Sequence, residues 1–64
     1  MKKFFAIGAY TYININLIEE VYTDEKAVVM HDGTKHTFNN ELFNELLEVL
    51  KPFMFGGESE FNAL

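Results

Sequence analysis

The stretch Val21-Tyr-Thr-Asp-Glu-Lys-Ala-Val-Val-Met-His-Asp-Gly-Thr-Lys-His-Thr-Phe38 decides the fold of this chain. Two runs of strand-forming residues, 27–31 and 34–38, flank Asp32-Gly33 within it. Asp-Gly between two such runs is a strong short-range signal for a hairpin with a two-residue turn. The stretch therefore predicts an antiparallel β-hairpin.

A second hairpin is expected near the N-terminus, formed by residues 4–7 and 10–15. Gly8 at the first central position of a two-residue loop is typical of a type II′ turn. That register places Phe5 opposite Tyr12 and leaves apolar side chains on both faces. We expect a helix to pack on one face and something else to cover the other.

Between the hairpins, residues 14–17 break the alternation and are expected to turn a corner. Residues 18–22 then form a strand and residues 23–26 a polar turn. A helix is predicted from about residue 41 to residue 50, because Asn39 or Asn40 can cap its start and Pro52 can stop it. Five apolar residues recur there at helical spacing: Leu42, Phe43, Leu46, Leu47 and Leu50.

Together these elements predict a small α+β fold. Residues 1–51 form an antiparallel β-meander of four to five strands with one C-terminal amphipathic helix, and residues 52–64 form an apolar tail. A chain of 64 residues buries only about 60% of its unfolded surface, so its stability is expected to be marginal. With no cysteine, disulfides and thiolate metal sites are excluded, which leaves self-association as the expected added source of stability.

The net charge and the hydropathy of the chain limit the classes of partner that it can bind. Ten carboxylates against five lysines give a net charge of −5, which argues against direct nucleic-acid binding. No run reaches the roughly 18 apolar residues that span a bilayer. We expect a soluble cytoplasmic protein that binds neither nucleic acid nor membrane.

The aromatic content points to a protein interface. Seven Phe and three Tyr are more rings than one small core can easily bury. The tail segment and the first hairpin hold the candidate partner-binding residues, which are Phe53, Met54, Phe55, Phe61, Tyr10 and Tyr12. The tail can either cover a sheet face of its own chain or dock on another molecule.

The two histidines are the only side chains expected to titrate near neutrality. In a two-residue hairpin His31 pairs with Thr34 and Val29 with His36, which places both imidazoles on one face. They are candidates for a small-ligand site, although part-buried structural histidines explain the pattern as well. Asp32 is expected to be engaged in the turn.

No catalytic or cofactor motif is evident in the sequence, and no metal site is predicted. Four carboxylates near one hairpin end could act as acids or bases only in a cleft, for which so small a domain has little room. They are Glu19, Glu20, Asp24 and Glu25. We expect no enzymatic activity.

The run Tyr12-Ile-Asn-Ile-Asn-Leu-Ile18, the Asp32-Gly33 turn and the amphipathic helix resemble the small flagellar FlbD-like proteins. The likeness covers residues 7–50 and implies an accessory protein without catalytic residues. The strand rhythm is also similar to the opening part of LytTR-type DNA-binding domains. DNA binding is not carried over from that family, because the basic residues and the second half are missing.

Three functions remain as hypotheses. The first is a non-enzymatic interaction or assembly module that associates with itself and with one protein partner. The second is an acidic inhibitor or nucleic-acid-mimicking decoy of mobile-element (phage-like) origin. The third is small-ligand or metal binding at the face of His31 and His36.

Overall fold

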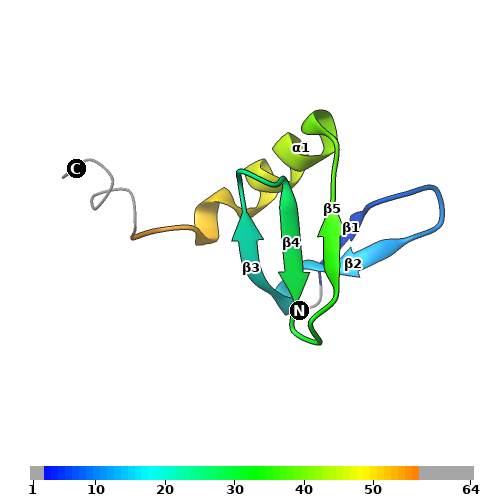
Figure 1. Ribbon diagram of the computed structural model, residues 1–64, viewed down its shortest axis with the longest axis horizontal. Coiled ribbons are helices and arrows are strands. Elements are labelled where there is room, and N and C mark those ends of the chain that lie inside the picture. The colour runs from blue at the N-terminus through cyan, green and yellow to red at the C-terminus, as the bar shows by residue number, and fades with distance from the viewer. Residues whose placement is uncertain (1–2, 57–64) are drawn as a thin grey trace.

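The structure, a computed structural model, describes residues 3–56 (Figure 1). Its elements are five strands, one α-helix and two short 3-10 helices, the latter labelled η. Their bounds are β1 Phe4–Ala6, β2 Tyr12–Asn14, η1 Ile15–Leu17, β3 Ile18–Tyr22, β4 Ala27–Met30, β5 Lys35–Thr37, α1 Asn40–Leu50 and η2 Lys51–Phe53. This order confirms the predicted α+β class with antiparallel strands and a helix near the C-terminus.

The strands form two sheets rather than one continuous meander. One sheet contains β1 and β2, and the other has the order β3-β4-β5. The break falls at the predicted corner, where η1 forms. Asn14 begins this turn, since its side-chain oxygen accepts a hydrogen bond from the Asn16 N–H at 3.0 Å.

The β4–β5 hairpin has a three-residue connection, so the predicted two-residue register is wrong by one residue. The Met30 N–H donates to the Thr34 carbonyl at 2.8 Å, and the Gly33 N–H donates to the Met30 carbonyl at 2.9 Å. Gly33 has a φ of +92°, as expected for a type I turn followed by a left-handed residue. A two-residue type I′ turn needs positive φ at Asp32 as well, and Asp32 does not adopt it.

The β1–β2 hairpin is likewise longer than predicted. Residues 8–10 form the connection, because the Ile7 N–H donates to the Thr11 carbonyl at 2.9 Å. The glycine that starts this connection lacks the positive φ of a type II′ turn. The predicted pairing of Phe5 with Tyr12 is therefore wrong.

Helix α1 confirms the prediction from local signals. The Asn39 side chain caps it by accepting a hydrogen bond from the Leu42 N–H at 2.8 Å. The helix ends at Leu50, and Pro52 lies within the short η2 that follows. Its apolar stripe faces inward, with Phe43, Leu46 and Leu50 buried.

The core lies between the three-stranded sheet, the helix and the first hairpin. Its main cluster consists of Ile13, Ile15, Val28, Met30, Leu46 and Leu50. Because Val28 and Met30 alternate with Ala27 and Val29 along β4, α1 covers the face that carries Val28 and Met30. Phe38 and Phe43 stack at the start of the helix, with ring centroids 6.3 Å apart.

Candidate functional site

The first candidate surface is the ribbon, defined as residues 4–14 with strands β1 and β2. Phe5 pairs with Ile13, and both side chains pack toward the core. A one-residue change of register exchanges the two faces of a strand. The outer face of the ribbon consequently carries Phe4, Ala6 and Tyr12, all exposed.

The most exposed aromatic residue of the ribbon, Tyr10, lies at its tip. Tyr10 lies in the connection and is 97% exposed, while Tyr12 is 64% exposed. Both were expected to contact a partner, and both are accessible for one. Phe4 was not among the expected residues, although it is 61% exposed.

The second candidate surface is the tail segment, defined as Phe53, Met54 and Phe55. All three side chains are exposed, Phe55 by 92%. The tail segment therefore does not cover a sheet face of its own chain. The Phe53 ring has an attractive neighbour, because the Lys3 Nζ lies 5.4 Å from its centroid. Phe61 lies outside the described residues.

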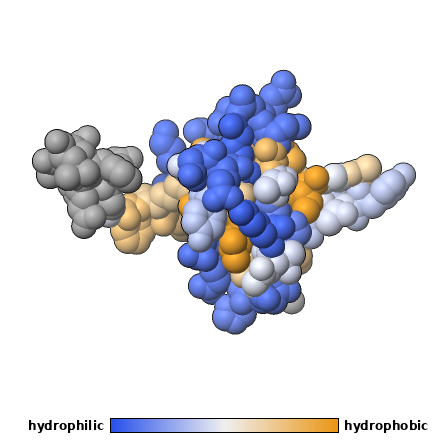
Figure 2. Space-filling view, in the orientation of Figure 1, coloured by the Kyte–Doolittle hydropathy of each residue, from blue (hydrophilic) through white to orange (hydrophobic). Residues whose placement is uncertain are grey.

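The tip of the ribbon and the tail segment lie at opposite ends of the molecule. In Figure 1 the connection of the ribbon projects at one end of the long axis and the tail segment leaves at the other. In Figure 2 the apolar tail segment likewise projects from a body with many hydrophilic residues on this face. A contact between the tip of the ribbon and the tail segment must therefore involve more than one molecule.

The histidines do not lie side by side on one sheet face as predicted. His36 pairs with Val28, on the face of the sheet turned toward the core, and is half-buried. His31 lies in the turn and is exposed. The three-residue connection causes the difference, because it moves His31 out of the strand.

The carboxylate of Glu19 contacts His31, a contact that the sequence did not predict. The His31 Nδ1 lies 2.8 Å from the Glu19 Oε1, and the contact becomes an ion pair when the ring is protonated. Glu19 stands on β3, where a register irregularity lies between Ile18 and Glu20. Only the pairing of β3 with β4 brings this residue near the turn, so no local signal could have found it.

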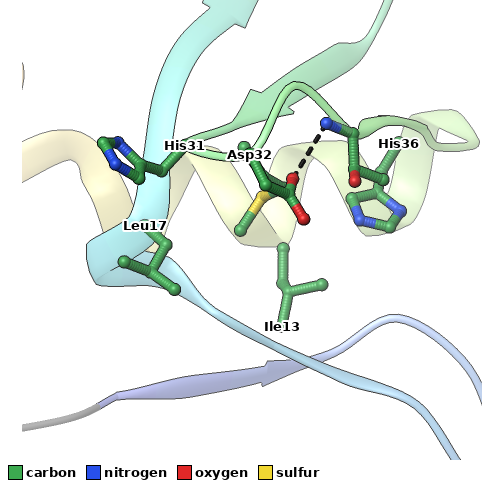
Figure 3. A pocket seen from close by; sticks show the side chains of 7 residues that line it. Ile13, Leu17, His31, Asp32 and His36 are labelled. Atoms are coloured by element: carbon green, nitrogen blue, oxygen red, sulfur yellow. Dashed lines mark hydrogen bonds between the residues drawn. The ribbon is translucent and has the colours of Figure 1, made fainter.

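A shallow hollow of about 250 Å³ connects the two histidines (Figure 3). Its apolar part comes from β2, η1 and β4, and its polar rim from the β4–β5 turn and β5. The lining residues are Ile13, Leu17, Met30, His31, Asp32, Thr34 and His36. In Figure 3 Asp32 lies between the two imidazoles, which do not point toward one another. The hollow can accept a small, partly apolar group.

Several polar groups around the β3–β4–β5 sheet are already engaged within the chain. As predicted, Asp32 serves the turn, since its carboxylate accepts the Thr34 N–H at 2.9 Å. This backbone hydrogen bond lowers the pKa of Asp32 below its usual value. The Glu25 carboxylate accepts a hydrogen bond from Lys35 and raises the pKa of that ammonium group.

The acidic cluster is in part paired within the chain. Glu19 contacts His31 and Glu25 contacts Lys35, so two of its four carboxylates have a positively charged or chargeable partner. A hydrogen bond with Glu20 raises the pKa of Tyr22. The cluster thus helps to organise the sheet.

Among residues 3–56, no three His, Cys, Asp or Glu side chains gather closely enough to hold a metal ion. No titratable side chain in the described part is fully buried. Within the same range, no helix has the length and apolar character needed to cross a membrane.

Comparison with known proteins gives no assignment. No protein-family model, no curated protein and no solved structure matches the chain. The resemblance to the flagellar FlbD-like proteins stays a prediction.

Proposed function

We propose that this protein is a non-enzymatic interaction module of the cytoplasm that associates with itself through exposed aromatic surfaces. The supporting observation is that its large exposed aromatic side chains gather in the ribbon and in the tail segment. Tyr10 and Phe55, one in each, are 97% and 92% exposed. Exposed aromatic groups that gather in this way are typical of protein interfaces.

The size of the core supports self-association. Eight hydrophobic residues are buried in the described part, in a chain of 64 residues. A domain of this size gains little stability from its core alone, and association of folded copies adds stability by mass action. No cysteine is present to add a disulfide.

The polar groups support a role in binding rather than in catalysis. A general acid or base usually needs a cleft that shifts its pKa toward neutrality. The described titratable groups are all at least partly exposed, and the resolved shifts move Asp32, Tyr22 and Lys35 away from neutrality. The tail segment is the surface we assign to one further protein partner.

Sedimentation velocity over a wide concentration range tests the proposal on the full chain. We expect the wild-type protein to be a dimer or larger, and the Tyr10→Ser/Tyr12→Ser variant to shift it toward monomer. Val49→Ala is the control, because Val49 is an exposed apolar residue of α1 that belongs to neither the ribbon nor the tail segment. A wild-type chain that stays monomeric at millimolar concentration would contradict self-association.

A second candidate function is small-ligand binding in the hollow between His31 and His36. It is favoured by one observation, namely that both imidazoles border the same apolar depression. A ligand that binds only the folded chain must raise its melting temperature. We expect small aromatic carboxylates to do so for the wild-type protein and not for His36→Ala. An unchanged melting temperature with these ligands and with zinc would remove this candidate.

A further inference from the structure

We infer that two copies of this chain associate through β1, whose free edge pairs antiparallel with β1 of a second copy about a two-fold axis. The two ribbons then form one four-stranded sheet. This inference rests on the proposed function, because it names the surface by which the module associates with itself.

The backbone of β1 is prepared for such pairing. The residue pairs that are hydrogen-bonded between the two strands of the ribbon are Ile7–Thr11, Phe5–Ile13 and Lys3–Ile15. Alternation then directs the N–H and C=O groups of Phe4 and Ala6 away from β2. No third strand borders β1 within the described residues, so these four groups form an open edge. A two-stranded ribbon is at best marginally stable alone, and added strands stabilise it.

Charge identifies a second copy as the occupant of this edge. Residues 4–18 contain no charged side chain, and all ten carboxylates of the chain lie at Glu19 or beyond it. Two copies that each carry a net charge of −5 repel one another, and the ribbon is where that repulsion is weakest. Edge strands of monomeric proteins are usually protected by lysine, proline or inward charges, and β1 has none of them between Phe4 and Ala6. The nearest lysine, Lys3, directly precedes β1 and its Nζ lies over the Phe53 ring.

The remaining edges are less suited to pairing. β3 carries Glu19 and Glu20 next to a register irregularity, and β5 carries Lys35. Charges and irregularities of this kind are the usual protection against edge pairing. β2 continues directly into η1, and the Asn14 side chain is occupied in starting that turn. β1 has no charged residue, no register irregularity and no 3-10 helix directly after it.

The side chains of β1 are self-complementary in one register. A two-fold axis through Phe5 places Phe4 opposite Ala6 of the second copy, and Ala6 opposite its Phe4. Their outward backbone groups then form the hydrogen-bonded pairs of an antiparallel ladder. A large and a small side chain face one another twice on the outer face of the ribbon.

A charge exchange at these two positions tests the register. Phe4→Lys/Ala6→Lys sets two lysines opposite each other twice in the dimer, whereas Phe4→Lys/Ala6→Glu sets lysine opposite glutamate twice. Both variants remove the same apolar groups from exposed positions, so each is the matched control of the other. Circular dichroism first verifies that both variants are folded.

We expect the double-lysine variant to raise the dimer dissociation constant at least about tenfold, because both symmetry-related pairs are lost at once. The lysine–glutamate variant should form the dimer again, and its dissociation constant should rise as salt is added. The dissociation constant of the wild-type dimer should stay the same or fall with salt. If the wild-type chain dimerises and both variants dimerise equally well, pairing through β1 is wrong while self-association stands. If the wild-type chain is monomeric throughout, both proposals fail.

Amide hydrogen exchange on the wild-type protein provides a test without substitution. The Phe4 and Ala6 amides face solvent in a single copy and are hydrogen-bonded in the inferred dimer. We expect their exchange to slow at least tenfold between dilute and concentrated samples, because in the dilute monomer these two amides have no hydrogen-bonded partner. Exchange that stays rapid at both residues in a sample shown to be dimeric would refute the inferred pairing.

Discussion

Replacement of Gly33 by L-alanine should destabilise the protein through backbone conformation alone. Gly33 has a φ of +92°, and a Cβ built there meets no atom within 4 Å. An L-residue in the left-handed region costs about 1–2 kcal/mol. Reduced flexibility of the unfolded chain returns about 0.4–1 kcal/mol of this, which leaves a net loss on the order of 1 kcal/mol.

Gly8 is the matched control for this substitution. A Cβ at Gly8 also meets nothing within 4 Å, but its φ lies outside the left-handed region. Gly8→Ala should therefore leave the stability unchanged or raise it by up to about 1 kcal/mol. D-Alanine at position 33, introduced by chemical synthesis, should stabilise the chain, because its mirror-image preference matches a positive φ.

Urea unfolding followed by far-ultraviolet circular dichroism measures these differences. A chain of this length has a total stability of about 3–10 kcal/mol, so a change of 1 kcal/mol is readily detected. In a thermal scan it corresponds to about 4–8 °C. Equal unfolding midpoints for Gly33→Ala and Gly8→Ala would refute the assignment of a three-residue connection with a left-handed glycine.

Three further predictions concern the core, the helix cap and the turn. Leu46→Ala should cost about 2–5 kcal/mol in urea unfolding because Leu46 is fully buried, whereas the exposed Val49→Ala should cost under 1 kcal/mol. Asn39→Ala should cost about 0.5–2 kcal/mol, because it removes the N-cap hydrogen bond, and Asn39→Asp should retain most of the stability. The hydrogen bond from the Thr34 N–H lowers the pKa of Asp32 in the folded protein. The Asp32 carboxylate therefore stabilises the fold above its unfolded pKa, and this stabilisation is lost as the pH falls through the folded pKa. Unfolding of Asp32→Asn should depend less on pH in this acid range than unfolding of the wild-type protein.

The helix and the corner could be predicted because their signals are local. The α1 cap, its apolar spacing and the proline beyond it all lie within a short stretch around residues 39–52. Asn14 caps η1 by the same short-range chemistry. Each of these features depends on hydrogen bonds between residues at most four apart, so the sequence pattern was sufficient.

The registers of both hairpins could not be predicted, since the patterns allow more than one. Asp32-Gly33 fits a two-residue turn and a three-residue turn, and the choice depends on whether Asp32 adopts positive φ. The hydrogen bond from Thr34 to Asp32 stabilises the longer connection. The contact between His31 and Glu19 depends in turn on this register and on the pairing of β3 with β4.

The aromatic content of the chain predicted an exposed aromatic face on the ribbon, although the predicted strand register was wrong. Apolar residues occupy both faces of β1, so either register leaves one apolar face directed away from the core. The observed register places Phe5 opposite Ile13 and inside, with Phe4 outside, whereas the predicted register would have placed Phe5 opposite Tyr12. A domain with one helix can cover only one face of such a ribbon. The exposed face of the ribbon thus follows from composition and topology together.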